Sequence, residues 1–231
     1  GALEGHARNV IWGDVAGVPV VALQGRVHLN ESPIASDVYP MVRLQMQMLC
    51  ELGVRTFILT CAAGSLTPPD PFGKLIPVGA RSGRSVSSLP VGSVMAINGF
   101  ILSRTTPPMP LFGGEFLSPD DKLDPHLRKL AQLAGHNAGL RSGVVEGGYA
   151  MMRGPDFEGR MYDKQNIAKD NARCVGMSTR PECCIAALYP GTKVLALAFI
   201  TNDDVAEHSH EENQRVAKAS QDKLGKMLEL L

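Results

Sequence analysis

Polar side chains that can bind a small anionic ligand follow several apolar runs of the sequence. Arg26 and His28 follow "VVALQG", and Asn202 ends "LALAFITN". An arginine can make two parallel hydrogen bonds to a phosphate, so Arg26 is a candidate anion ligand. The segment "YAMMRGPDFEGR", residues 149–160, runs from an apolar strand into a turn that presents the ring of Phe157 and the carboxylate of Glu158. These residue types indicate a site for a small polar ligand.

Each of these residues also has a purely structural explanation. Asp156 could cap a helix, and Glu158 would then lie in its first turn, where the helix dipole favours a carboxylate. Arg26 alone could form a surface ion pair. His28 and His6 could be structural histidines with satisfied ring nitrogens. Whether these side chains bind a ligand or are purely structural depends on the strands and helices that position them.

Apolar runs rich in Val, Ile and Leu alternate with helical patterns, which predicts an α/β fold. We expect strands over residues 18–25, 55–61, 93–101, 143–152, 173–178 and 193–202, and helices over 36–52, 124–139, 159–170, 181–190 and 207–231. Because the strands are almost continuously apolar, we expect burial on both faces of the sheet. Arg26 and His28, two residues apart, would share one strand face. Ligands collect at the carboxyl ends of strands in open α/β sheets, which is where these polar residues lie.

The bulk composition limits the possible classes of protein. A chain of 231 residues with 44% hydrophobic content predicts one domain over 1–231, with residues 67–89 as a long exposed loop rich in Pro, Gly and Ser. Lys plus Arg and Asp plus Glu both number 23, so no net field favours nucleic acid or a membrane surface. The five cysteines form no C-x-x-C pair, which indicates reduced thiols and a cytoplasmic location. No apolar run approaches the roughly 20 residues that span a bilayer.

Six short motifs occur in order along the chain: "EGHAR", "GRVHLNE", "CAAGSL", "YAMMRGPDFE", "VGMSTRPE" and "FITNDD". Together they resemble the trimeric purine nucleoside phosphorylase family, which includes methylthioadenosine phosphorylase. The resemblance implies one α/β domain with a central mixed, twisted sheet flanked by helices. It also implies that phosphate attacks the anomeric carbon of a purine ribonucleoside and releases the base and ribose 1-phosphate. Inorganic phosphate would be the co-substrate, no cofactor or metal would be needed, and the chain would form a homotrimer.

The same resemblance assigns roles to individual residues. It implies phosphate binding by Arg26, His28, His6, Ser178 and the backbone of Ala62. It implies base binding by Ala63, Gly64, Phe157, Glu158 and Asn202. It implies ribose binding by Tyr149, Met177, His210 and, from a neighbouring subunit, Phe116, with His208 as an alternative to His210. The catalytic residues would be Asn202, Glu158 and His28.

The implied roles at the base agree with the chemistry of a purine. A 6-oxopurine has an N1–H donor, and a fixed carboxylate such as Glu158 accepts from it and rejects bases that lack it. Phe157 would stack on the base. The amide of Asn202 would hydrogen-bond N7 as negative charge builds on the leaving purine, which stabilises the transition state. The methylthioadenosine branch usually has Asp at position 202 and lacks the Glu, so this pair favours inosine and guanosine.

The sequence also departs from the family pattern. A Gly-rich phosphate loop is expected some tens of residues before "GHA", yet the sequence begins at Gly1, so either that segment is absent from the printed chain or the phosphate site is incomplete. Asn30 stands where the family has tyrosine, and Asp203 stands where vertebrate proteins often have lysine. Two alternatives follow: a catalytically impaired subunit that binds purines or has a structural role, and hydrolysis by water. A metal at His208 and His210 is less favoured, because histidines two apart do not share a helix face.

Overall fold

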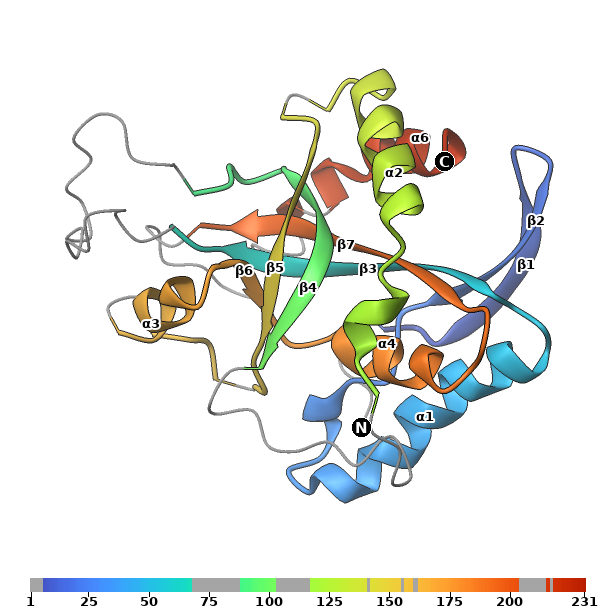
Figure 1. Ribbon diagram of the computed structural model, residues 1–231, viewed down its shortest axis with the longest axis horizontal. Helices are drawn as coiled ribbons and strands as arrows, with labels where there is room; N and C mark the ends of the chain where they lie inside the picture. Colours follow the sequence, from blue (N-terminus) through green and yellow to red (C-terminus); the bar gives the residue numbers. More distant parts are fainter. Residues whose placement is uncertain are drawn as a thin grey trace.

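A mixed sheet that closes on itself forms the centre of the molecule (Figure 1). The computed structural model describes residues 6–67, 88–102, 117–140, 142–154, 156–159, 162–203, 215–216 and 218–231. Within these ranges the barrel consists, in order, of β3 (Thr56–Ser65), β6 (Ala172–Gly176), β5 (Val144–Met151), β4 (Val94–Leu102) and β7 (Lys193–Asn202). β3 is parallel to β7 and antiparallel to β6, whereas β4 is parallel to β5 and antiparallel to β7. The predicted α/β class with a mixed sheet is confirmed.

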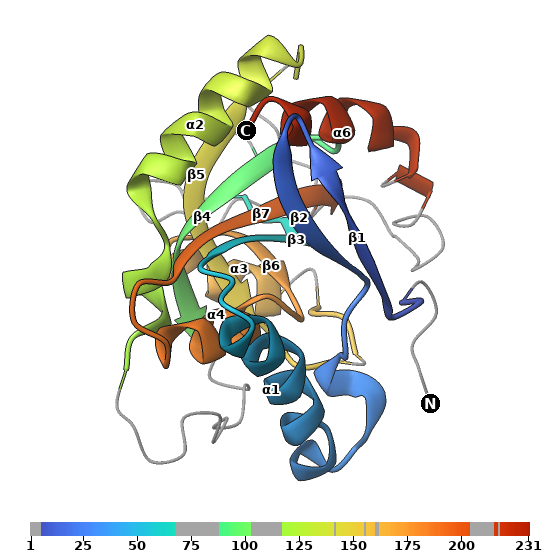
Figure 2. The same ribbon diagram turned by 90° about the vertical axis from the view of Figure 1, so that its right-hand side faces the viewer.

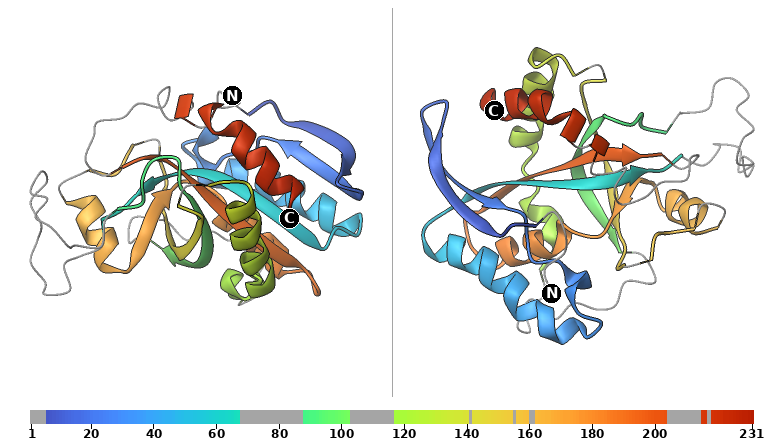
Figure 3. Two further views of the ribbon diagram at one scale, coloured as in Figure 1. Left: turned by 90° about the horizontal axis from the view of Figure 1, so that it is seen from above. Right: turned by 180° about the vertical axis from the view of Figure 1, so that it is seen from behind.

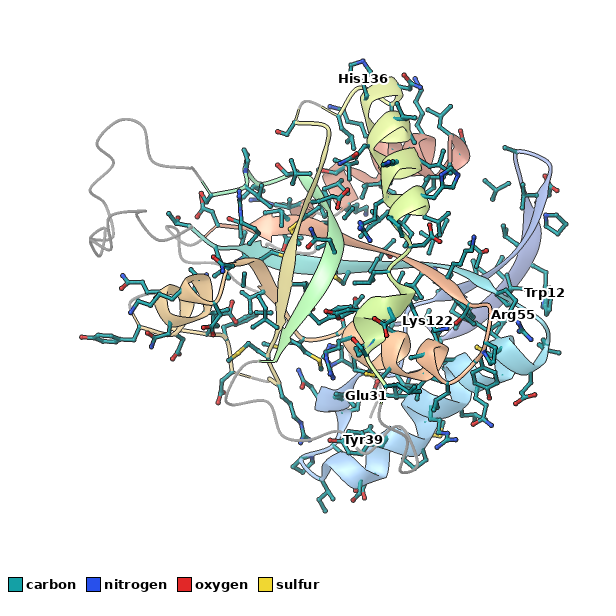
Figure 4. All side chains as sticks on the ribbon, in the orientation of Figure 1. Trp12, Glu31, Tyr39, Arg55, Lys122 and His136 are labelled. Carbon is teal, nitrogen blue, oxygen red and sulfur yellow. The ribbon has the colours of Figure 1, made fainter. Side chains whose placement is uncertain are left out.

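A separate hairpin stands beside the barrel (Figure 2). It pairs β1 (Asn9–Val15) with β2 (Val18–Gln24) through a two-residue turn, Ala16–Gly17, in which both residues have positive φ. Such a turn matches the twist of the two strands. β2 was expected, but β1 was missing from the prediction because nearly all of its side chains face solvent and give no alternating pattern. Trp12 of β1 is 69% exposed and lies on this hairpin, away from the barrel (Figure 4).

Helices surround the barrel on several sides (Figures 1 and 3). α1 (Ala35–Glu51) packs against α4 (Arg180–Ala187), and α2 (Pro125–Asn137) packs against α6 (Gln221–Glu229). α3 (Asp163–Lys169) lies against β6. Two short 3-10 helices, η1 (Leu29–Glu31) and η2 (Pro119–Lys122), precede α1 and α2.

Local sequence explains the two longest helices. α1 buries Val38, Val42, Met46 and Leu49, which recur at helical spacing and form one apolar face against the central core. α2 begins where the sequence "DP" predicts it: the side chain of Asp124 accepts a hydrogen bond from the backbone of Leu127, and a proline follows it at the first helical position. Both helices confirm the predicted ranges to within two residues.

Burial of the strands follows the prediction only in part. β7 is buried on both faces along all but its first residue. In the first half of β3, by contrast, Thr56, Ile58 and Thr60 are exposed while Phe57 and Cys61 are buried. The expectation of burial on both faces is therefore wrong for this half of β3, because alternate side chains of a strand point to opposite faces and one face here meets solvent.

Several other predictions are corrected by the structure. α3 starts at Asp163 rather than 159, and Tyr162 is its first flanking residue, so Asp156 does not cap it. The proposed loop 67–89 lies almost wholly outside the described residues, but its last residue, Leu89, is buried in the core. The predicted helix 207–231 is described only in its second part, around α6.

The cysteines are all buried free thiols, as the composition predicts. None of the helices in the described ranges is long and apolar enough to cross a membrane.

Candidate active site

Arg26 joins three segments of the chain at the centre of the candidate site. Its Nη1 donates to Ser178 Oγ at 2.6 Å, and its Nη2 donates to the carbonyl oxygen of Thr60 at 2.6 Å. Its Nε lies 3.0 Å from Glu182 Oε1, in an ion pair that is largely buried. Burial is the largest single influence and lowers the pKa of Arg26, but the Glu182 carboxylate, together with nearby cysteine and tyrosine side chains, raises it by more, so the pKa is raised overall. Arg26 is therefore a fixed cation rather than a mobile surface side chain.

The guanidinium of Arg26 keeps unused donors. An arginine has five N–H groups, and the three contacts to protein use one on each nitrogen. One N–H on each terminal nitrogen is left without an acceptor among the described residues. Two such donors are what a bidentate contact with a phosphate or carboxylate uses.

His28 is held by its neighbours in a defined tautomer. Its Nδ1 accepts from the backbone N–H of Asn30 at 3.2 Å, so the proton of the neutral ring is on Nε2. Its own backbone N–H donates to Glu31 Oε1 at 2.7 Å, and Glu31, labelled in Figure 4, also pairs with Arg8. Burial and the nearby positive charge of Arg26 lower the pKa of His28 to about 4. At neutral pH the ring is an uncharged hydrogen-bond donor.

His6 contacts the same segment. Its Nδ1 accepts from the backbone N–H of Arg26 at 3.1 Å, and its ring lies 6.2 Å from that of His28. The chain just before Arg26 differs from the prediction: β2 ends at Gln24, and Gly25, with φ of +91°, turns the chain out of the strand. The expectation that Arg26 and His28 share a strand face is thus wrong, because both lie beyond the strand. His6 and His28 lie close together by virtue of this turn.

Ser178 is positioned by a buried tyrosine. The backbone N–H of Ser178 donates to the hydroxyl of Tyr149 at 3.2 Å, and Tyr149 is completely buried against Phe100. A side chain at Gly176 would lie 2.4 Å from this hydroxyl, so glycine is required there. The structure gives Tyr149 a supporting role under Ser178, and its contact with a ribose stays a prediction.

Asn202 lies at the end of β7 against the end of β3. Its Oδ1 accepts from Thr201 Oγ1 at 3.2 Å, and its Nδ2 lies 2.7 Å from the position that a side-chain Cβ at Gly64 would occupy. The absence of a side chain at Gly64 is what admits the amide. The two neighbouring residues from "CAAGSL" differ in exposure: Ala62 is exposed and Ala63 is buried.

Glu158 and Phe157 follow β5. Phe157 is 49% exposed, whereas Glu158 is buried at 8%. Its carboxylate has no hydrogen-bond or ion-pair partner within the described part of the chain. Its oxygens are not among the unpaired side-chain atoms that are sealed from solvent, so a donor from a ligand can replace the water that reaches them. Glu158 is therefore suited to accept a hydrogen bond from a ligand.

Met177 contacts Asn30 beside the phosphate-binding candidates. Asn30 Nδ2 lies 3.2 Å from its sulfur, and the absence of a side chain at Gly154 leaves room for both residues. β3 runs past both halves, since Thr60 contacts Arg26 and Gly64 pairs with Asn202. Four residues of a strand span roughly 13 Å. The anion donors and the amide are thus separated along one strand.

Some predicted site residues cannot be located. His210, its alternative His208 and Phe116 lie outside the described residues. Within the described ranges, no three His, Cys, Asp or Glu side chains are grouped so that they could hold a metal ion.

Three residues of the site were missed from the sequence. Glu182 and the carbonyl of Thr60 act on Arg26 through contacts distant in sequence. Thr201 acts on the side chain of the next residue, Asn202, through its hydroxyl. The local sequence around Glu182 points to another role: "TRPE" at 179–182 predicts that its carboxylate caps a helix rather than pairs with Arg26.

Comparison with known proteins places the chain in a family. The sequence profile described as Phosphorylase superfamily matches residues 2–231. The chain belongs to this superfamily. Purine nucleoside phosphorylase of Rattus norvegicus is 31% identical to it over 237 residues, which cover 99% of this chain and 75% of the rat protein.

Solved structures of the superfamily agree in fold. Purine nucleoside phosphorylase of Schistosoma mansoni in complex with inosine gives a TM-score of 0.76 at 27% identity, covering 100% of this chain and 79% of that chain. A Schistosoma purine nucleoside phosphorylase in complex with guanosine gives a TM-score of 0.73 at 27% identity, covering 96% and 78%. The resemblance predicted from the six motifs is confirmed, and the homology supports nucleoside phosphorolysis as the general function of this superfamily member.

Proposed function

We propose that the protein cleaves 6-oxopurine ribonucleosides, inosine and guanosine, with inorganic phosphate to give the free base and ribose 1-phosphate. The observation that carries the proposal is the state of Arg26. Its guanidinium is fixed by three protein acceptors and retains one N–H on each terminal nitrogen, beside the hydroxyl of Ser178. Such a fixed pair of donors suits two oxygens of a phosphate. The neutral ring of His28 supplies a further N–H in the same segment.

The proposed base site uses the other half of the candidate site. Glu158 is buried without a partner among the described residues, which supports a role as acceptor for the N1–H of a 6-oxopurine. Asn202 has its Oδ1 directed to Thr201, which favours its Nδ2 as the donor to N7 of the purine. Phe157 is 49% exposed, and we assign its ring to stacking on the base. The solved complexes of Schistosoma enzymes with inosine and guanosine support a purine nucleoside as the ligand, and the choice of 6-oxopurines rests on Glu158 and Asn202.

The proposed reaction follows from a phosphate site and a base site on either side of the ribose. One oxygen of the bound phosphate attacks the anomeric carbon while the bond from that carbon to the purine nitrogen breaks, and the electron pair of that bond goes to the purine. The hydrogen bond from Asn202 strengthens as this charge appears, so it lowers the barrier rather than merely tightening binding. Alignment of phosphate and nucleoside supplies much of the remaining rate. In this proposal no side chain acts as a covalent nucleophile and no metal or organic cofactor takes part.

We further propose a homotrimeric, cytoplasmic enzyme. The trimer follows from the family resemblance, in which Phe116 of one subunit reaches the ribose site of the next. Sedimentation analysis of the purified protein tests the subunit number directly.

The release of hypoxanthine from inosine, measured with and without phosphate, tests the function. Cleavage only in the presence of phosphate, with ribose 1-phosphate as a product, is the expected result. Cleavage that does not need phosphate would replace the proposal with hydrolysis. Binding of inosine without cleavage in either condition would favour a catalytically impaired subunit instead.

A further inference from the structure

Glu182 contributes a contact to the candidate phosphate site without facing the ligand. Its Oε1 accepts from Nε of Arg26 at 3.0 Å, whereas the donors assigned to phosphate are on the two terminal nitrogens of the guanidinium. The side chains of Arg26 and Glu182 are only 16% and 10% exposed. A carboxylate at this position fixes the rotation of the guanidinium plane, because the remaining donors on Nη1 and Nη2 must lie in that plane.

The local sequence predicts a different use for Glu182. Thr179, Arg180, Pro181 and Glu182 match the pattern of a capping box, in which the threonine hydroxyl and the glutamate carboxylate satisfy backbone N–H groups at the start of a helix. Thr179 is the flanking residue of α4 and Glu182 lies in its first turn, yet the Thr179 side chain makes no capping hydrogen bond. The carboxylate pairs with Arg26 instead. The helix start therefore gives up a favourable local interaction.

The backbone at the same place is strained. Thr179 has φ of +73° and ψ of −50°, and the backbone N–H of Arg180 donates to the carbonyl oxygen of Ser178 at 2.9 Å. This is the γ-turn with positive φ, which a β-branched residue adopts rarely. The turn lies between Ser178 and Glu182, the two side chains that hold Arg26. Strain that persists between two contacts to one side chain indicates that those contacts determine the local structure.

We propose that Glu182 is a positioning residue for phosphate: its carboxylate oxygen orients Arg26, and its negative charge limits how tightly the site holds the anion. This inference rests on the proposed phosphorolysis. The two contributions are opposite in sign for phosphate affinity. Loss of the acceptor oxygen loosens the guanidinium and weakens binding, whereas loss of the charge alone leaves the cation of Arg26 uncompensated and strengthens binding.

Three substitutions separate these contributions. Glu182→Gln keeps an acceptor oxygen at the same reach and removes the charge, so the KM for phosphate should fall at least about threefold. Glu182→Asp keeps the charge but shortens the side chain by one methylene, and Glu182→Ala removes both; in each the KM for phosphate should rise about tenfold or more, because the donors are no longer aligned. The KM for inosine should stay within about twofold in all three, since the base contacts lie at the other end of the site.

The matched control is Glu146→Ala. Glu146 forms an ion pair of similar length, 2.9 Å, with Arg128 between β5 and α2, outside the candidate site. Loss of this pair should leave both KM values unchanged. Melting temperatures of all variants show whether each is folded, and if Glu182→Ala does not fold, the opposite shifts expected for the Gln and Asp variants still test the proposal.

Phosphate binding is also measured by titration calorimetry of inorganic phosphate into each protein without nucleoside, at constant ionic strength. A lower Kd for Glu182→Gln and a higher one for Glu182→Asp support the inference, even if the wild-type protein fails to cleave inosine. Equal phosphate affinity in all variants would overturn it, even if wild type cleaves inosine with phosphate. A rise in the KM for inosine that matches the rise for phosphate would also overturn it, because that result indicates a general structural role.

Discussion

Gly64→Ala tests whether the position of the Asn202 amide controls turnover. An added Cβ at Gly64 would lie 2.7 Å from Asn202 Nδ2, whereas ordinary contact begins at 3.4 Å, so the amide must retreat by about 0.7 Å. Backbone strain is not expected, because Gly64 does not have a positive φ. The atom that must move is the end of a side chain, so the fold should lose about 1 kcal/mol or less. The change therefore acts on the amide more than on stability.

A displacement of this size should lower kcat substantially. Misplacement of a catalytic group by about 1 Å can lower a rate about a hundredfold, so we expect a loss of about tenfold to a hundredfold, or about 1.4 to 2.8 kcal/mol of transition-state stabilisation. The KM for phosphate should change less than about twofold, because Arg26 and Ser178 do not contact Gly64. The assay is the initial rate of hypoxanthine release at saturating phosphate and varied inosine.

Gly13→Ala is the control for this experiment. No atom lies within 4 Å of a Cβ added at Gly13, which is on the hairpin outside the barrel. Its kcat should equal that of the wild type. If Gly64→Ala keeps kcat within about twofold of the wild type while its melting temperature is unchanged, the position of Asn202 does not limit catalysis and the role proposed for its amide is refuted.

Two further predictions concern single side chains of the site. Glu158→Gln should raise the ratio of kcat/KM for adenosine to that for inosine by about tenfold or more, because a neutral amide no longer selects for the N1–H donor; an unchanged ratio would remove Glu158 from base selection. His28 has a folded-state pKa of about 4 against an ordinary value of 6.5, caused first by burial and then by Arg26, so the folded protein disfavours its protonation. The stability that the neutral ring contributes is present above about pH 6.5 and is lost as the pH falls toward 4, by at most about 3 kcal/mol. The melting temperature of the wild type should therefore fall more steeply than that of His28→Gln between these values, and parallel curves would contradict the assignment.

The fold could be predicted where burial gives a strong pattern. β7 is nearly all apolar and was located at both ends, and α2 was marked by the aspartate and proline at its start. The strand predicted over 55–61 found the start of β3 but missed its end at Ser65, because the small residues after Cys61 give no strand pattern. β1 could not be predicted, because a solvent-facing hairpin strand is specified by its partner and its turn rather than by alternating hydrophobicity. The turn that takes the chain out of β2 was also missed, because one glycine gives no clear pattern in the sequence. A single glycine, Gly25, adopts positive φ there and carries Arg26 and His28 out of the strand.

The candidate site was predictable in its residue types but not in the contacts that hold them. Arg26, Glu158 and Asn202 were found because a charged or amide side chain after an apolar strand is unusual in itself. Their supports had no such signal: Glu182 acts on Arg26 across 156 positions of the sequence, and its own neighbours predict a helix cap. The Glu182 carboxylate can either cap the start of α4 or pair with Arg26. It pairs with Arg26, because a guanidinium left unpaired in the interior is far less favourable than a helix start without its cap. A local motif that fails in the structure is thus the best pointer to a contact that the sequence conceals.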